Sequence, residues 1–250
     1  MSSRAPQVMG PGRQLRIAAS SAAPAGAARI ATRSGPPRGS PASTADRRAR
    51  LLDIVVGGTA LVVAAPLMGV IAVVVAATSR GGPLFRQVRL GRDEQPFVMY
   101  KFRTMYVGCD DRSHREFVRR VLLGTAPPVG AGGLHKIVDD PRVTRVGRVL
   151  RRTSLDELPQ LFNVLRGDMA LVGPRPVLPW EAQLFRPEHR ARFLVRPGIT
   201  GLWQVSGRSR LSMTQALDLD VEYVRTRCLV LDLRILVRTV PVVLAGGGAR

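Results

Sequence analysis

The chain is poor in the residues that build metal centres, disulfides and base-stacking surfaces. It has two cysteines, three histidines and 5% aromatic residues in 250 positions. Cys109 and Cys228 are isolated and no C-x-x-C pair occurs, so neither a disulfide framework nor a zinc site is indicated. The few aromatics and the lack of any RRM, KH or zinc-finger pattern argue against a nucleic-acid-binding domain. A reducing compartment is the natural expectation.

Acidic residues and lysine are also scarce. The chain carries 38 basic residues against 18 acidic ones, for a formal net charge of +20, and only Lys101 and Lys136 are lysine. Such a charge predicts an anionic partner, which by charge alone is nucleic acid, anionic lipid or a phosphorylated substrate. Arginine suits phosphate because its planar guanidinium presents several donors in one plane.

The first half of the chain contains two segments of unusual composition. Residues 1–45 are rich in Ala, Pro, Gly, Ser and Arg without a periodic apolar face, which predicts a disordered basic tail. Residues Ile54 to Ser79 then run for 26 positions without a charge. That length exceeds the roughly 20 residues needed to cross a bilayer core. We therefore predict a membrane segment over residues 46–80 and a catalytic domain over residues 81–250.

The flanks of the membrane segment carry arginine on both sides. Arg47, Arg48 and Arg50 precede it, and Arg80 and Arg86 follow. Because arginine marks the cytoplasmic side of a span, both ends qualify as cytoplasmic. Pro66 in the middle would bend a helix. The pattern favours a re-entrant helix-break-helix that enters and leaves by one face. A single kinked span, with tail and domain on opposite sides, is the alternative.

The remaining residues predict an α+β domain that is mostly helical. PFVMYKF has strand composition, and Gly91-Arg92-Asp93 before it predicts a hairpin turn. Helical spacing predicts a short basic helix near residues 112–123 and another within residues 139–152. The run LDLDVEYVRTRCLVLDLRILVRTVPVVL is amphipathic, and its charges favour an interfacial position over a second span.

The stretch TSLDELPQ places two acids side by side, Asp156 and Glu157. Ser154 and Glu157 have the S-x-x-E spacing of a capping box, and Pro159 fits the first turn if Asp156 is the cap. Leu161 and Leu165 continue a helical apolar face towards a stop at Gly167. On this stretch alone, a helix start is favoured over a reaction centre.

Several runs in their order along the chain resemble those of one bacterial enzyme family. They are GGPLFRQVRLG, YKFRTM, DDPRVTRVGRVLRRTSLDELPQLFNVLRGDMALVGPRPV, RPGITGLWQVSGR and the LDLDVEYV…LDLRIL tail. Together they cover roughly residues 50–240 and resemble the bacterial sugar transferases, the monotopic phosphoglycosyl transferases. The resemblance implies transfer of a phosphosugar from a UDP-sugar to a membrane polyprenyl phosphate, with release of UMP.

The resemblance also implies roles for the acidic pair. Asp156 would be the nucleophile that attacks the diphosphate, and Glu157 would hold Mg²⁺. An Asp in the first turn of a helix is kept ionised by the helix dipole, which agrees with a nucleophilic role. Mg²⁺ needs only one or two carboxylates when substrate phosphates supply further oxygens. Capping and catalysis are then compatible, because the helix start presents the nucleophile.

Further positions match the family's substrate- and phosphate-binding residues: Lys101, Arg103, Arg151, Arg175, Arg208 and Asp232. The ordinary alternative for each is a surface or interface ion pair, which contributes little. The P-R-P run around Arg175 has the further alternative of a rigid connector. Trp203 is equally compatible with an interfacial anchor and with the core.

Two departures from the family pattern affect the predicted topology. The family's hairpin often breaks at Ser-Pro, whereas this chain has Ala65-Pro66, which leaves a straighter helix open. Larger members carry extra spans before this module, so a minimal form is expected here. The expected location is the inner membrane with the domain facing the cytoplasm. A homo-oligomer is compatible with the sequence, and nucleic acid is not an expected partner.

A catalytically silent, membrane-anchored scaffold of the same fold is the alternative function. The presence of Asp156, Glu157, Arg151 and Lys101 together argues against it. The sequence carries no signal for the sugar, the polyprenol length or the pathway.

Overall fold

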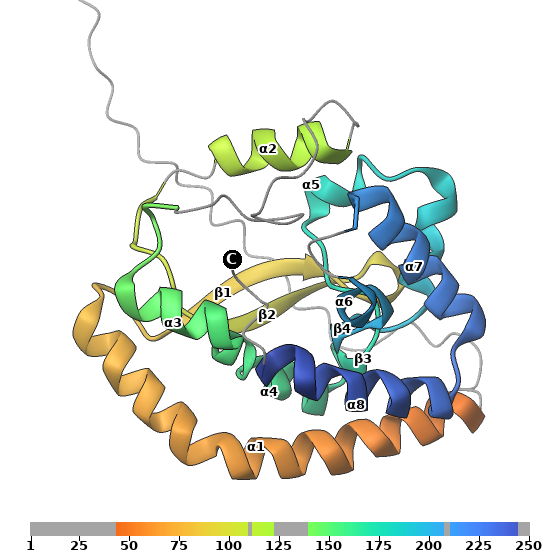
Figure 1. The fold of residues 1–250 in the computed structure, drawn as a ribbon, viewed down its shortest axis with the longest axis horizontal. Helices are drawn as coiled ribbons and strands as arrows, with labels where there is room; N and C mark the ends of the chain where they lie inside the picture. The colour runs from red at the N-terminus through yellow and green to blue at the C-terminus, as the bar shows by residue number, and fades with distance from the viewer. Residues whose placement is uncertain (1–43, 110–111, 123–139, 208–210, 245–250) are drawn as a thin grey trace, which may run out of the picture. The chain divides into compact units, whose positions relative to one another are not determined.

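The computed structural model describes residues 44–109, 112–122, 140–207 and 211–244 (Figure 1). The predicted basic tail therefore lies outside the described residues, apart from its last two positions, and so does Arg208. The helices before the acidic pair Asp156–Glu157 are α1 (Thr44–Thr78), α2 (Arg112–Leu122) and α3 (Arg145–Thr153). The helices after this pair, which we call the dyad, are α4 (Gln160–Arg166), α5 (Pro179–Ala182), α6 (Leu202–Ser206), α7 (Met213–Thr226) and α8 (Leu229–Leu244). Single 3₁₀ segments are η1 (Arg92–Glu94), η2 (Leu155–Glu157) and η3 (Pro187–Leu194), and the strands are β1 (Leu84–Leu90), β2 (Pro96–Phe102), β3 (Ala170–Val172) and β4 (Gly198–Thr200).

The apolar segment forms one helix, α1, of 35 residues that continues through Pro66. Figure 1 shows that this helix bends along its course instead of separating into two. Among the described residues it is the one helix long and apolar enough to cross a membrane. Large apolar side chains such as Val62 and Val63, each 75% exposed, have no protein to cover them. These properties support membrane association, whereas the side of the membrane at each end stays a prediction.

The predicted hairpin is confirmed. Strands β1 and β2 pair antiparallel from Leu84 opposite Phe102 to Leu90 opposite Pro96. The connection is the 3₁₀ turn η1, in which Asp93 and Glu94 take positive φ angles of 54° and 57°. A second, parallel pair between β3 and β4 was not predicted from the sequence, because each strand has only three residues.

The helices follow the apolar spacing of the sequence. Helices α2 and α3 occupy the predicted positions, and α4 ends at Gly167, whose φ of 90° is the left-handed conformation expected at a helix stop. The C-terminal amphipathic run is two helices, α7 and α8, with a break at Arg227. Helix α8 exposes Val230 and Val237 and buries Asp232 and Ile235. Its interfacial position stays a prediction.

The core lies where α1, α4 and α8 meet β2 and the β3–β4 pair. Its buried side chains are Met99, Leu161, Val164, Met169, Leu171, Val172, Val195, Tyr223 and Ile235. A second apolar cluster joins α5, η3, α6 and α7 and includes Trp203, which is 7% exposed. Trp203 is thus a core residue, and the alternative of an interfacial anchor is wrong. A third cluster packs Ile71 and Val75 of α1 against Phe102 and Leu150.

Candidate active site

The two adjacent acids lie on a single 3₁₀ turn between two helices. Helix α3 ends at Thr153, and its C-cap Ser154 turns the chain with a φ of 58° before η2, which carries Asp156 and Glu157. The Ser154 side chain makes no cap hydrogen bond, and Pro159 occupies the N-cap of α4. The predicted capping box and the predicted Asp156 cap are therefore wrong. Because η2 intervenes, Asp156 precedes α4 and is not in its first turn.

Glu157 is held by two positive side chains. Lys101 Nζ lies 2.9 Å from Glu157 Oε1, and both terminal nitrogens of Arg175 lie 3.3 Å from the same oxygen. Burial would raise the pKa of Glu157, but the charges of Lys101 and Arg175 outweigh burial and hold this pKa below its usual range. The ion pair raises the pKa of the Arg175 guanidinium in turn. Glu157 is therefore an ionised, paired carboxylate.

Asp156 has a different environment although it is the neighbouring residue. It is 8% exposed, and none of the described residues donates a hydrogen bond to its carboxylate. Burial raises the pKa of Asp156, while the positive charges of Lys101 and Arg151 act in the opposite direction. The dyad thus combines a paired carboxylate with an unpaired one. An unpaired carboxylate near three cations is suited to attack an electrophile that carries negative charge.

Lys101 reaches Glu157 because β2 is tied to α4 by a buried asparagine. Asn163 Oδ1 accepts a hydrogen bond from Tyr100 N at 3.1 Å, and its Nδ2 donates to Val98 O at 2.7 Å. Asn163 is completely buried. It satisfies two backbone groups of β2 just before Lys101 and so holds this strand against α4. Asn163 was not predicted from the sequence, where its only signal is a polar residue between Phe162 and Val164.

Four of the eight predicted site residues meet at the dyad and a fifth lies beside it. Asp156, Glu157, Lys101 and Arg175 are in contact or adjacent, and Arg151 approaches from the last turn of α3. The Arg175 side chain contacts Glu157, which a residue of a rigid connector would not need to do.

Two predicted residues lie elsewhere, and Arg208 lies outside the described residues. Arg103 donates to Gly82 O at 2.8 Å and to Leu84 O at 3.3 Å, so it braces the turn before β1. Asp232 accepts a hydrogen bond from Tyr223 Oη at 2.7 Å in the core. Burial raises the pKa of Asp232. Their substrate-binding roles stay predictions without a contact to the dyad among the described residues.

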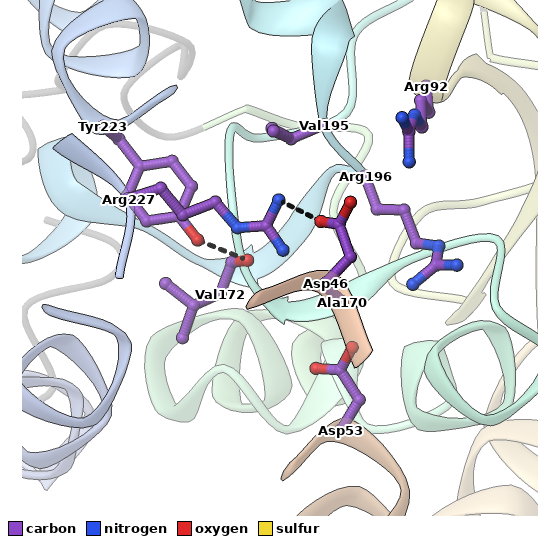
Figure 2. Close-up of a pocket in the computed structure, with 9 residues that line it drawn as sticks. All are labelled: Asp46, Asp53, Arg92, Ala170, Val172, Val195, Arg196, Tyr223 and Arg227. Atoms are coloured by element: carbon purple, nitrogen blue, oxygen red, sulfur yellow. Dashed lines mark hydrogen bonds and ion pairs between the residues drawn. The ribbon is translucent and has the colours of Figure 1, made fainter. Parts of the chain in front are cut away.

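A separate polar pocket lies at the start of α1 (Figure 2). Arg227 Nη1 lies 2.8 Å from Asp46 Oδ1, and Tyr223 Oη donates to Val172 O at 3.1 Å. Asp53, deeper in α1, accepts a hydrogen bond from Leu171 N at 2.8 Å. These contacts attach the first turns of α1 to β3 and α7.

The acidic pair has the composition of a small magnesium site. The described residues contain no group of three His, Cys, Asp or Glu side chains that would hold a metal by protein ligands alone. Mg²⁺ takes one or two carboxylates together with waters and substrate phosphates, so two adjacent acids fit it. The contacts of Lys101 and Arg175 all fall on Oε1 of Glu157, and the carboxylate of Asp156 has no partner among the described residues.

Residues 45–246 match the protein family described as bacterial sugar transferase. Galactosyl transferase CpsE of Streptococcus agalactiae serotype III is 38% identical over 205 residues, which cover 80% of this chain and 43% of the streptococcal protein. The exopolysaccharide production protein ExoY of Sinorhizobium fredii is 38% identical over 200 residues, covering 80% of this chain and 87% of ExoY. A UDP-glucose:undecaprenyl-phosphate glucose-1-phosphate transferase of Caulobacter vibrioides is 39% identical over 217 residues, covering 84% and 74%. The chain thus spans less than half of the streptococcal relative and most of the other two.

Proposed function

The chain belongs to the bacterial sugar transferase family, and from this we propose that it transfers a sugar 1-phosphate from a UDP-sugar to a membrane polyprenyl phosphate. The products are UMP and polyprenyl-diphosphate-sugar, and the reaction is the first membrane step of a polysaccharide pathway. The observation that carries the proposal is the dyad, in which Asp156, without a hydrogen-bond donor among the described residues, lies beside a Glu157 held by Lys101 and Arg175. Relatives named for galactose and glucose make a UDP-hexose the first donor to test.

The first displacement uses Asp156 as the nucleophile. A carboxylate oxygen attacks the phosphorus that bears the sugar, and the bond from that phosphorus to the UMP oxygen breaks. The electron pair leaves with UMP, and an aspartyl phosphosugar forms without any net proton transfer. Lys101, Arg151 and Arg175 lie close enough to neutralise charge on the diphosphate oxygens.

The second displacement regenerates the carboxylate. An oxygen of the polyprenyl phosphate attacks the same phosphorus, and the bond to Asp156 breaks. The acceptor has a lipid tail, so the dyad must lie at the depth of the phosphate heads. The bare apolar length of α1 and the exposed apolar residues of α8 support such a position.

Glu157 would hold Mg²⁺ together with phosphate oxygens of the donor. When bound, the cation would withdraw charge from the diphosphate and favour the ionised form of Asp156. This chain supplies the rest: Lys101 and Arg175 fix the orientation of Glu157, and burial keeps water away from Asp156.

The topology that we propose is re-entrant, with the domain on the cytoplasmic side of the inner membrane. Contacts at both ends of α1 support it. Arg50 donates to Leu165 O at 2.7 Å near the start of the helix, and Val75 packs in a cluster with Phe102 and Leu150 near its end.

Intact-protein mass spectrometry of the full chain in detergent tests the chemistry. Wild type is mixed with Mg²⁺ and a panel of UDP-hexoses and N-acetylated UDP-sugars, without a lipid acceptor. We expect a phosphosugar mass on wild type with one donor, its loss on adding polyprenyl phosphate, and no adduct on Asp156→Asn. UMP release that requires the lipid, with no adduct from any donor, would contradict the two-step mechanism. Neither adduct nor UMP from any donor would favour the scaffold alternative.

A further inference from the structure

The backbone of the loop that carries Arg175 is fixed by hydrogen bonds from other segments of the chain. Four consecutive carbonyls each accept a hydrogen bond from another part of the chain. Pro174 O accepts from Gly198 N at 2.9 Å, and Val177 O accepts from Leu90 N at 3.0 Å. Between them, Arg175 O accepts from Arg192 at 2.6 Å, and Pro176 O accepts from Arg89 at 3.2 Å. The two middle carbonyls of the four therefore accept their hydrogen bonds from arginine side chains.

Arg192 is the more deeply buried of the two donors. Its side chain is 3% exposed, and its Nη2 also lies 2.8 Å from Asp220 Oδ2, which is likewise 3% exposed. The guanidinium carbon lies 5.2 Å from the ring centre of Phe185 and 5.8 Å from that of Phe193. These two aromatic neighbours, together with Asp220, restrict where the guanidinium nitrogens can point. The geometry thus fixes one nitrogen against a single backbone carbonyl.

The pair is a poor device for stability alone. Burial lowers the pKa of Arg192 and raises that of Asp220 to about 7, so both charges are disfavoured by their surroundings. In the part of the chain that the structure describes, Asp220 Oδ1 is buried without a hydrogen-bond partner. A buried ion pair can often be replaced by apolar residues of similar volume without loss of stability. The presence of this buried pair is better explained by a need to position the backbone of Arg175 than by a contribution to stability.

We propose that Arg192, fixed by Asp220, is a positioning residue that holds the backbone of Arg175 so that its guanidinium meets Glu157. The chain of contacts runs from α7 through η3 to the loop and then to the dyad. Arg192 touches no reacting group and acts only through Arg175. The inference rests on the proposed function, because its readout is formation of the aspartyl phosphosugar.

An apolar replacement of the whole pair separates position from stability. In Arg192→Met/Asp220→Leu no unpaired charge is left, so we expect a melting temperature equal to or above that of wild type. The rate of adduct formation should fall about 10- to 100-fold, because a displaced catalytic contact costs on this scale. A rate within about twofold of wild type would overturn the proposal.

Two further variants cover poor folding of that replacement and a general packing effect. Arg192→Lys keeps the charge but loses the planar fork, so it should pair with Asp220 and slow adduct formation about 10-fold. Asp218→Asn is the matched control, because Asp218 joins the same two elements through His189 at 2.9 Å without reaching the loop. It should leave the rate unchanged. If Arg192→Lys reacts at the wild-type rate, or Asp218→Asn is slowed as much, the positioning role is refuted.

A double-mutant cycle with Arg175→Ala distinguishes a positioning role of Arg192 from a merely structural one, because only the positioning role makes the two effects on the rate of adduct formation depend on each other. If Arg192 acts only through Arg175, adding Arg192→Lys to Arg175→Ala should change the rate less than about twofold. Multiplied losses would contradict the inference. Absence of adduct in wild type would overturn the proposed function and this inference together. A wild-type adduct with unchanged variant rates would overturn this inference alone.

Discussion

Two neighbouring carboxylates in this protein have opposite electrostatic environments. Burial raises the pKa of Asp156, whereas Lys101 and Arg175 outweigh burial at Glu157 and lower its pKa. Groups whose pKa values are separated in this way can take different chemical roles at one pH. Here the paired Glu157 is suited to hold a cation, and the unpaired Asp156 is suited to attack phosphorus.

We predict that Asp156→Asn stabilises the protein while abolishing adduct formation. A folded-state pKa above the unfolded value of 3.8 means that the folded state binds the extra proton, so wild-type stability falls as pH rises through that window. Asp156→Asn has no carboxyl group to ionise, so its stability does not fall in this way. We expect its advantage to be near zero at pH 4 and to grow towards neutral pH, reaching ~1 kcal/mol. Thermal unfolding at a series of pH values measures the difference.

Glu157→Gln is the control with the opposite sign. The lowered pKa of Glu157 stabilises the folded state above its unfolded value of 4.5, and this contribution is lost as pH falls through the folded-state pKa. Removing the carboxylate leaves Lys101 and Arg175 unpaired, so we expect a loss of ~3 kcal/mol at neutral pH. If both variants shifted the melting temperature in the same direction, the assignment of paired and unpaired carboxylates would be wrong.

The packing of α3 against the segment after β2 depends on the absence of a side chain at Gly147. A Cβ at Gly147 would lie 2.1 Å from Thr104 O, a backbone atom that cannot move aside cheaply. The approach is close because Thr144 N donates to Thr104 O at 3.0 Å, which seats the first turn of α3 beside the residues after β2. The same helix carries Arg151 towards the dyad.

We therefore predict that Gly147→Ala displaces α3 and slows the reaction. The expected cost is about 1–3 kcal/mol of stability from overpacking. Adduct formation should slow by roughly 10-fold because Arg151 moves with the helix. Melting temperature and adduct rate measure the two effects. Gly69→Ala is the control, since no atom outside its own helix turn lies within 4 Å of the added Cβ. Equal losses in both variants would show that the contact with Thr104 is not responsible.

Elements with a strong local pattern were predictable from the sequence. The apolar run of α1, the hairpin of β1 and β2, and the spacing of α3 and α4 all follow from periodicity and turn residues. The adjacency of Asp156 and Glu157 was visible in the chain, and their role came from the family resemblance. Lys101 and Arg175 were named as well, although nothing local indicates that they meet at one carboxylate oxygen.

What escaped prediction depends on contacts between distant segments. The left-handed Ser154 and the 3₁₀ turn that follows replace the expected helix start, and no residue type at that position demands them. Arg192 and Asp220 lie 28 positions apart, and their pairing depends on how η3 packs against α7. Charged side chains are ordinarily exposed, whereas both of these are buried. Such residues become visible only when tertiary packing is known.

Helix α1 as a whole is attached to the domain near both ends, and it exposes large apolar side chains between these attachments. Asp46 and Asp53 bind groups near the start of the helix, and Ile71 and Val75 are buried near its end. Val62 and Val63 between them are largely exposed. A straight helix of this length would extend ~52 Å and carry its ends to opposite faces of a bilayer. One set of contacts would then be lost.

We predict that both ends of α1 face the cytoplasm, and cysteine labelling tests this. Cys109 and Cys228 are exposed and are first replaced by serine. Arg47→Cys and Gly82→Cys, at exposed positions on either side of the apolar run, are then made separately. A membrane-impermeant maleimide should label both in inside-out vesicles and neither in intact spheroplasts. Val63→Cys should react in neither preparation, because a membrane-inserted middle is shielded from the reagent. If one of the two flanking cysteines reacts from outside, α1 crosses the bilayer, and the contacts at its ends cannot coexist in the membrane.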